Sequence, residues 1–252
     1  MVTNGESATS MRSLSRAIDV LEVLESAPSG LRLSEIARRA DLHVSTAQRI
    51  LVALEQRGRV ERDDNRYRAG AGLLFGAHAY LTGSPLVINA RPVLQELAAS
   101  TELTASVFVR TGFHRAVIAR VVGSDPLRYE LPVGERLPLH VGAGKTLAAQ
   151  LPDEDRERLV AEVTPYVAAS GREWTAAALR EELDRVRAQG YAVASGERVL
   201  GTRSVSAPVR DPDGEAVAAM QVTGTLEAFP EGRVPSLAAV IRNAADRLGR
   251  QL

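Results

Sequence analysis

The sequence feature that most restricts the fold is the order of predicted elements in the first 70 positions: two helices, a tight turn, a third helix and a β-hairpin. Apolar residues spaced as on one helical face predict the first helix over 13–26, with Ser13 able to cap its start. A shorter helix is predicted from Ser34, and Asp41-Leu42-His43 connects it to a third helix over 44–56. The apolar faces of such short helices are expected to pack on one another.

A β-hairpin is predicted directly after the third helix. Segments 59–62 and 65–68 flank Asp63-Asp64, and an acidic pair between two short strands is typical of a tight turn. Three helices followed by a hairpin make up a winged helix-turn-helix, whose recognition helix lies in the major groove of DNA. We therefore predict a winged helix-turn-helix domain over 13–70.

The third predicted helix has two chemically different sides. Its apolar side consists of Ala47, Ile50, Leu51 and Leu54, and its polar side of Ser45, Gln48, Arg49 and Gln56. Arg suits guanine, Gln suits adenine, and Ser or Thr suits either bases or phosphates. We expect the first turn to lie deepest in the groove and the arginines of the hairpin to contact phosphates or the minor groove. The predicted DNA contacts are Ser45, Thr46, Gln48, Arg49, Arg62, Arg66 and Arg68.

Two alternatives to DNA reading stay open at this point. Polar residues on an exposed helix can simply be solvated, and a net charge of zero does not by itself indicate nucleic acid. A winged helix can also bind a protein partner, although such a surface would show more exposed apolar anchors. The order of the elements favours DNA over both, with Arg49 as the strongest candidate for a base contact.

The rest of the chain predicts a tail, a linking helix and a larger second domain. Residues 1–12 are interpreted as a disordered polar tail, 71–84 as a linking helix, and 85–252 as a domain in which strands and helices are interspersed. Predicted helices span 91–100, 144–151, 153–163, 175–189 and 235–250, and predicted strands span 104–110, 115–122, 128–133, 191–195, 205–209 and 215–223. The fold class is therefore α+β, with an antiparallel sheet flanked by helices in the second domain.

Composition excludes several kinds of site. The chain has no cysteine, which removes disulfides, thiolate nucleophiles and zinc–thiolate sites. The four histidines are not spaced as metal ligands, and there is no G-x-S-x-G nucleophile motif. No apolar run approaches the roughly 18 residues of a bilayer span, and the start shows no export signal. We expect a cytoplasmic protein that is not an enzyme and uses no metal or cofactor.

Two separated blocks of this sequence resemble the IclR-type family of bacterial regulators. The first domain matches it in LSRAIDVLEVL and LSEIARRADLHVSTAQRILVALEQRGRVERDDNRYRAG, and the second in LRYELPVGERLPLHVGAGKTLAAQL and RAQGYAVASGERVLGTRSVSAPVRDPDGEAVAAMQVTG. The resemblance covers nearly all of 12–250. It implies a winged helix-turn-helix, a linking helix and a GAF/PAS-like effector-binding domain, in dimers or tetramers that bind palindromic operators in double-stranded DNA.

The resemblance also implies a pocket for a small-molecule effector in the second domain. Backbone N–H groups at the helix start near 142–144 favour an anion, such as the carboxylate of a small acid. Gln221 and Thr223 should share one face of the sheet, because side chains alternate along a strand. Some family members carry an acid near Ala194-Ser195, and this chain does not. The implied effector-binding residues are Ala143, Gly144, Ala194, Ser195, Thr202, Ser204, Gln221 and Thr223.

Segment 142–146 only partly resembles a nucleotide-binding loop. Leu139 occupies the position where that motif requires its first glycine, so we reject a phosphate-loop function. Lys145, the only lysine, has two open interpretations: an ion pair within the protein or at its surface, or a contact to the ligand. His140 is expected in the pocket or the core, and Glu197 is expected in a structural turn.

The preferred hypothesis is a ligand-responsive transcriptional regulator, more often a repressor, that is controlled by a small organic or aromatic acid. A small-molecule-processing enzyme and a winged-helix protein-interaction module are the alternatives. Turnover of an acid or ester by the protein would support the enzyme. DNA binding that is unchanged by Arg49→Ala would support the interaction module.

Overall fold

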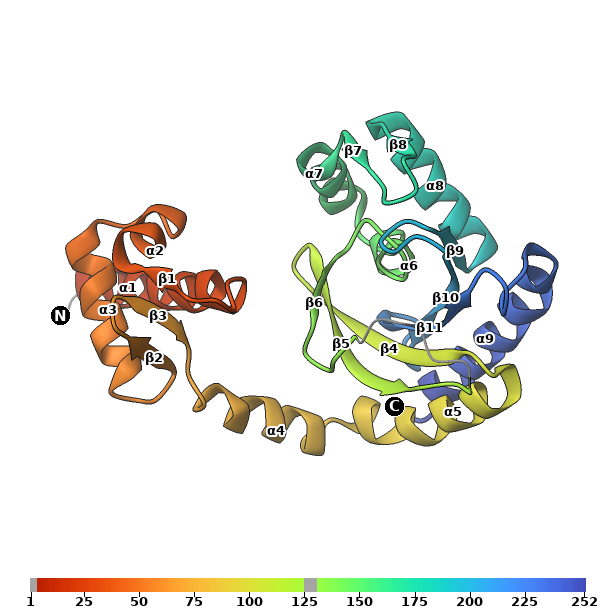
Figure 1. Ribbon diagram of the computed structural model, residues 1–252, viewed down its shortest axis with the longest axis horizontal. Coiled ribbons are helices and arrows are strands. Elements are labelled where there is room, and N and C mark those ends of the chain that lie inside the picture. The colour runs from red at the N-terminus through yellow and green to blue at the C-terminus, as the bar shows by residue number, and fades with distance from the viewer. Residues whose placement is uncertain (1–3, 125–130) are drawn as a thin grey trace. The chain divides into compact units, whose positions relative to one another are not determined.

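A computed structural model describes residues 4–124 and 131–252 of the chain. By its internal contacts the chain divides into two compact units, of which the first ends at Tyr80 and the second begins at Leu81 (Figure 1). The predicted α+β class is confirmed, with a small helical unit that carries a short sheet and a larger unit built on one antiparallel sheet.

The first unit is a winged helix-turn-helix. Its sheet has the strand order β1-β3-β2, with Leu31 of β1 opposite Tyr67 of β3. The core beneath it includes Val20, Ile36 and Leu51, each with an exposed fraction of 0%. The elements are α1 (Asn4–Glu25), β1 (Leu31–Arg32), α2 (Leu33–Arg39), α3 (Val44–Glu55), β2 (Val60–Asp63) and β3 (Arg66–Ala69).

Two features of this unit differ from the prediction. Helix α1 begins at Asn4, so the expected disordered tail over 1–12 is wrong for 4–12, while 1–3 lie outside the described residues. Apolar spacing starts only at Leu14, but a nucleated helix can extend through polar residues because each added residue brings one hydrogen bond. Strand β1 was not predicted, because two residues are too few to show an alternating pattern.

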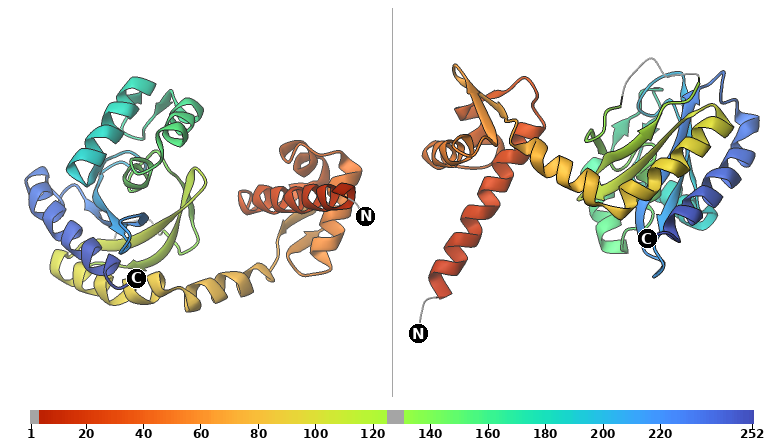
Figure 2. Two further views of the ribbon diagram at one scale, coloured as in Figure 1. Left: turned by 180° about the vertical axis from the view of Figure 1, so that it is seen from behind. Right: turned by 90° about the horizontal axis from the view of Figure 1, so that it is seen from below.

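The second unit is built on a six-stranded antiparallel sheet with the order β6-β5-β4-β11-β10-β9. Helices α5 and α9 pack on one face of this sheet and α6 packs on the other, with α8 beside α6 and α7 beside α8 (Figures 1 and 2). The strands are β4 (Thr104–Thr111), β5 (His114–Val121), β6 (Arg136–Pro138), β9 (Ala192–Ser195), β10 (Thr202–Arg210) and β11 (Ala216–Thr225). Helix α4 (Leu73–Gly83) crosses the boundary between the two units. The other helices, α5 (Pro85–Thr101), α6 (Gly144–Ala148), α7 (Asp153–Val163), α8 (Ala176–Gln189) and α9 (Val234–Gly249), belong to the second unit.

Some element boundaries of this unit were predicted and others were not. Helix α8 follows the prediction closely, with Thr175 accepting a cap hydrogen bond from the Ala178 backbone and Gly190 ending the helix in the left-handed conformation. The predicted strand over 128–133 is wrong where the structure describes it, since 131–133 are not in a strand and the edge strand is β6. The small sheet of β7 (Tyr166–Val167) and β8 (Glu173–Trp174) was not predicted, because each strand has only two residues.

The two faces of the main sheet differ: the face toward α5 and α9 is apolar, and the other, called here the polar face, carries hydroxyl and amide groups beside a second apolar core that includes Phe108 and Ala219. Val205 of β10 lies opposite Val222 of β11 and Val193 of β9, and this row packs toward α5 and α9. The neighbouring row places Ser204 opposite Thr223. Because side chains alternate along a strand, that row points to the opposite face, the side of α6. The sheet therefore presents hydroxyl and amide groups where a ligand could approach.

Candidate functional site

Helix α3 exposes the polar side that the sequence predicted. Ala47 and Leu51 are fully buried against the other helices, whereas Ser45, Gln48 and Arg49 are exposed. Thr46 is half-buried, so it offers less surface than the other three. The prediction that one face packs and the other stays available is confirmed.

The first turn of α3 is fixed by its own cap. The ring nitrogen Nδ1 of His43 accepts a hydrogen bond from the Ser45 backbone and lies 2.8 Å from the Ser45 hydroxyl. This contact holds the Ser45 side chain back toward His43. In this arrangement the Ser45 hydroxyl already has a hydrogen-bond partner.

Two valines on the exposed face of α3 were missed by the sequence analysis. Val44 and Val52 have exposed fractions of 45% and 44%, and on a helix they lie on the side that carries Gln48. Apolar side chains in the major groove can contact the methyl group of thymine. A helical wheel that included all residues of α3, and not only the polar ones, would have identified these two valines.

The three wing arginines do not share one face or one role. Arg66 donates to the Gly30 carbonyl at 2.9 Å, and Arg68 forms an ion pair with Glu61 at 3.2 Å. Arg62 lies over the Tyr67 ring, with its guanidinium carbon 5.5 Å from the ring centre. All three side chains are exposed, and each already has a partner within the unit.

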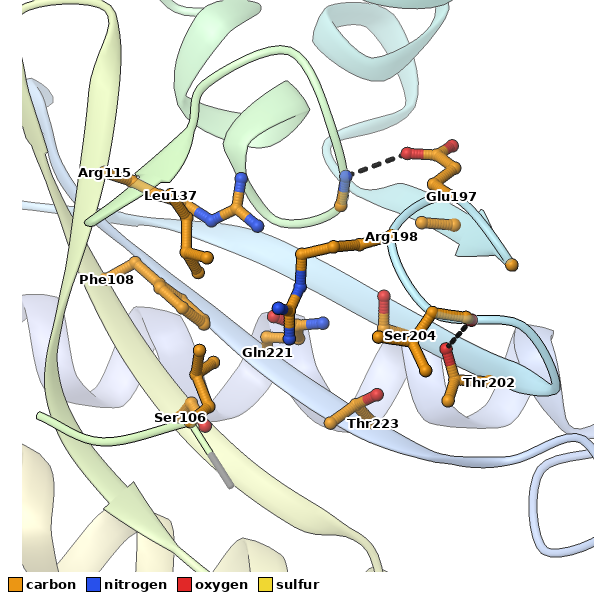
Figure 3. A pocket seen from close by; sticks show the side chains of 15 residues that line it. Ser106, Phe108, Arg115, Leu137, Glu197, Arg198, Thr202, Ser204, Gln221 and Thr223 are labelled. Carbon is orange, nitrogen blue, oxygen red and sulfur yellow. Dashed lines mark hydrogen bonds between the residues drawn. The ribbon is translucent and has the colours of Figure 1, made fainter. Parts of the chain in front are cut away.

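The second unit contains a pocket on the polar face of its sheet, with about 490 Å³ of space between the surrounding atoms, its open mouth included. Figure 3 shows this pocket from close by. Gln221 and Thr223 lie on the same face, as predicted, and Gln221 is opposite Ser106 of β4. The predicted residues that line the pocket are Ala194, Thr202, Ser204, Gln221 and Thr223.

Three predicted pocket residues do not line it. Ser195 follows an inward-facing residue on β9, so its side chain points outward, where it accepts a hydrogen bond from Arg203 at 2.9 Å. Ala143 is fully buried, and Gly144 packs against the Leu139 carbonyl and the Arg115 side chain so closely that a Cβ would overlap both. The loop contributes Gly142 to the lining instead.

Two arginines in the pocket were missed by the sequence analysis. Arg115 comes from β5, and Arg198 comes from the loop between β9 and β10; in Figure 3 both guanidinium groups point into the pocket, Arg198 toward Gln221. Arg115 is 3% exposed and donates to the carbonyl groups of Pro138 and Val141. Arg198 belongs to the GERVLG segment that the sequence analysis assigned to a turn, and a charged residue at the tip of that turn was the available signal.

Lys145 is held inside the protein and does not reach the pocket. Its side chain is 1% exposed, and its Nζ bonds Glu182 at 2.7 Å, Glu197 at 2.5 Å and the Val193 carbonyl at 3.0 Å. Burial raises the pKa of Glu182, but the charges of Lys145 and Arg185 and their hydrogen bonds outweigh it and leave that pKa below its ordinary value. Of the two open interpretations, the ion pair within the protein is confirmed.

An aromatic cluster lies beside this ion network. The Trp174 ring has Lys145 Nζ 5.2 Å from its centre and the Arg172 guanidinium 4.0 Å away. Tyr166 stacks on Trp174 with 6.0 Å between ring centres and meets His140 edge to face at 4.5 Å. His140 is half-buried against Tyr166 at the edge of the core and does not line the pocket.

His140 gives this cluster a pH dependence. Burial lowers the pKa of His140 to about 4, and the charges of Arg115 and His114 lower it further, so the ring is neutral in the folded protein at pH 7. The unfolded chain binds this proton near pH 6.5, so the stability gained from a neutral ring is present above that pH and lost as the pH falls toward 4. We expect the free energy of unfolding of the wild type to fall faster over this window than that of His140→Phe. Urea titrations of both proteins across this pH range measure the difference. An equal dependence of the free energy of unfolding on pH in the two proteins would contradict the prediction.

Within the described ranges 4–124 and 131–252, no helix is both long enough and apolar enough to cross a membrane. The same part of the chain contains no group of three or more His, Asp or Glu side chains placed to hold a metal ion.

Comparison with known proteins shows that both units match models of the same family. Residues 13–64 match the model of the IclR helix-turn-helix domain, and 78–250 match that of the bacterial transcriptional regulator IclR C-terminal domain. The chain is 33% identical over 246 residues to the HTH-type transcriptional regulator BhcR of Paracoccus denitrificans, covering 96% of this chain and 88% of that protein. It is 28% identical to the transcriptional repressor IclR of Escherichia coli, covering 93% and 88%.

A solved structure agrees with this assignment. An IclR homologue from Microbacterium hydrocarbonoxydans, in complex with 4-hydroxybenzoate, aligns with a TM-score of 0.71 at 25% identity, covering 95% of this chain and 98% of that one. A recognition helix with an exposed polar face and a second domain with a lined pocket are the two parts that such a regulator requires. The chain belongs to the IclR family of bacterial transcriptional regulators, and it is a ligand-responsive DNA-binding protein.

Proposed function

We propose that this regulator is a repressor that binds a palindromic operator as a dimer or tetramer. We further propose that a small carboxylic acid controls its binding to DNA. The observation that carries the proposal is the pocket, where two guanidinium groups face hydroxyl and amide side chains. Guanidinium groups bind carboxylates through paired, charge-assisted hydrogen bonds. An effector shifts DNA affinity only as far as it binds the DNA-competent and DNA-released forms differently.

The proposed DNA contacts come from α3 and the wing. Gln48 and Arg49, exposed on α3, would read base edges, and Ser45 and Thr46 would enter the groove with the first turn of the helix. The wing arginines Arg62, Arg66 and Arg68 would contact phosphates or the minor groove by exchanging their present partners within the unit. Support comes from their exposure and from the match of 13–64 to a helix-turn-helix model.

The operator proposal is tested by footprinting on DNA upstream of the protein's own gene. We expect protection of a palindromic site at physiological salt, with half-sites one helical turn or a multiple apart. Equal affinity for that DNA and for a scrambled duplex of the same length would exclude specific operator binding. Release of the site when the acid is added, and reduced transcription without it, would identify a repressor.

The proposed ligand class is a small organic or aromatic acid. The homologue from Microbacterium hydrocarbonoxydans holds 4-hydroxybenzoate, and the pocket of this chain pairs Phe108, an aromatic surface, with Arg115 and Arg198. Arg115 is committed to two backbone carbonyls. Arg198 lies on an exposed loop and points at Gln221, so we assign the carboxylate to Arg198 and the far end of the ligand to Ser204, Gln221 and Thr223.

Replacing Arg198 with alanine is expected to weaken binding of an aromatic carboxylate about tenfold or more, because the charge-assisted pair is lost. Isothermal titration with 4-hydroxybenzoate and related benzoates measures the change. The matched control is Arg242→Ala, an exposed arginine on α9 across the sheet from the pocket. If Arg198→Ala binds the acid as tightly as the control does, the carboxylate is held elsewhere.

The proposed oligomer is supported by helix α4. This helix contains no charged residue and none of its side chains is buried, and Leu74 and Phe75 are 68% and 76% exposed. An apolar helix that is exposed on all sides is normally covered by a partner. A second copy is the partner that a palindromic operator requires, because each half-site takes one recognition helix.

Placing a charge at Phe75 tests this interface. Phe75→Glu is expected to lower the mass of the protein in solution toward that of the monomer, since an interface would have to bury the carboxylate without a partner. Light scattering after size exclusion measures the mass. Val167→Glu is the control, since Val167 is 64% exposed and lies on β7 in the second unit. An unchanged mass for Phe75→Glu would place the contact on another surface.

The proposed location is the cytoplasm, where a regulator meets both DNA and metabolites. The cysteine-free composition is compatible with a reducing compartment.

A further inference from the structure

Lys145 is the centre of a buried charge network behind the pocket wall. It is the only lysine of the chain, and its ammonium group bonds carboxylates from two different elements, Glu182 of α8 and Glu197 of the loop after β9. A third bond goes to the Val193 carbonyl. All three donors of the ammonium group are therefore used inside the protein.

Glu197 connects this network to the ligand pocket. It lines the pocket, and its side chain is 7% exposed. One carboxylate oxygen is bonded to Lys145, and the other accepts a hydrogen bond from the Gly142 backbone at 2.8 Å, as the dashed line in Figure 3 shows. A carboxylate thus forms part of a wall that also carries Arg115 and Arg198.

The two carboxylates of this network are matched by two cations only because Lys145 is present. Glu182 has a second cationic partner, Arg185, at 2.5 Å. Among the interactions resolved at Glu197, Lys145 supplies the one full positive charge, and Gly142 supplies a backbone dipole. An uncompensated carboxylate beside a pocket would repel an anionic ligand strongly, because charges in a poorly solvated site are weakly screened.

We propose that Lys145 determines the charge preference of the pocket without touching the ligand: it neutralises Glu197, so that the arginines dominate the pocket and an acid binds in preference to its neutral analogue. This inference rests on the proposed acid effector. Lys145 is a positioning residue, and it also ties the Gly142 loop and the 196–201 loop to α8 through Glu197 and Glu182.

The test compares an acid with its neutral analogue in matched variants. Lys145→Met removes the ammonium group and keeps an unbranched apolar chain, while K145M/E197Q removes both charges and leaves an amide oxygen that can still accept from Gly142. The probes are 4-hydroxybenzoate and 4-hydroxybenzamide, with affinities from isothermal titration and folding checked by circular dichroism. We expect K145M to lower the affinity for the acid at least about tenfold, with little change in the affinity for the amide. We expect K145M/E197Q to restore the affinity for the acid to within about threefold of the wild-type value.

The other outcomes decide against the proposal or separate it from the proposed function. An equal loss of affinity for the acid and the amide in K145M, with no rescue by E197Q, would show that Lys145 has a purely structural role and would overturn the proposal. If K145M does not fold, the single variant E197Q tests the proposal, because it removes one of the two carboxylates that Lys145 neutralises. Tighter acid binding with unchanged amide binding supports the proposal, and weaker binding of both overturns it. If the wild type binds amides as well as acids across a benzoate series, the acid effector fails, and this inference fails with it.

Discussion

Arg49→Ala is expected to reduce affinity for a specific operator about tenfold to hundredfold per half-site, without changing the fold. Arg49 is exposed on α3, two residues after the buried Ala47, so its removal leaves the packed side of the helix intact. A bidentate arginine–guanine contact contributes about 1–3 kcal/mol of discrimination against a wrong base. Gel-shift titrations with the operator and with a variant that changes one guanine measure both the loss and the relaxed specificity.

The control for this prediction is an arginine of equal charge that lies far from α3 in sequence. Arg91 of α5 is exposed, and Arg91→Ala removes the same charge from the second unit. Loss of affinity that is equal in both variants would mean that net charge, and not base reading, is responsible. Retention of full specificity in Arg49→Ala would move the base contact to Gln48 or to the wing.

Gly144→Ala is expected to have the largest effect on stability among conservative changes near the pocket. A Cβ at this position would overlap the Leu139 carbonyl oxygen and the Arg115 guanidinium, and the main-chain atom can give way only if the loop moves. Overpacking of this kind costs about 1–3 kcal/mol or more. For a domain of this size, that corresponds to a fall in Tm of roughly 2–4 °C per kcal/mol. Acid binding should fall too, because Arg115 lines the pocket.

The matched substitution is Gly232→Ala in the short 3-10 helix before α9. Apart from Gly232 itself, its two chain neighbours and the nearby backbone of its own helix, no heavy atom of the described residues lies within 4 Å of the Cβ that this change adds, so its Tm should stay close to that of the wild type. Differential scanning calorimetry distinguishes the two variants. If Gly144→Ala has the same Tm as Gly232→Ala, the loop before α6 can move away from the added methyl group more easily than its packing indicates.

The sequence predicted the elements whose side chains repeat with a clear period. Helix α3 could be predicted together with its faces, because Ala47 and Leu51 alternate with polar residues at helical spacing. The placement of Gln221 and Thr223 on one sheet face followed from strand alternation in the same way. Pocket residues on regular strands were therefore easier to predict than pocket residues on loops.

The residues that were missed depend on contacts between distant segments. Arg115 and Arg198 are 83 positions apart in the numbering, and only the folded sheet and loop bring them to one pocket. The partners of Lys145, on α8 and after β9, show no local pattern either. Ser195 and Gly144 were assigned from resemblance, which located the right loop and strand but could not give the direction of a side chain or the closeness of a carbonyl.

The division of the sheet into an apolar and a polar face has a consequence for how such regulators diverge. Substitutions at Ser106, Ser204, Gln221 or Thr223 alter the surface offered to a ligand, while the row that contains Val205 and Val222 continues to pack on α5 and α9. The polar pocket residues and the core against α5 and α9 are thus encoded at alternate positions of the same strands. A lineage can therefore change its ligand through substitutions at the polar pocket residues, while the core against α5 and α9 is retained.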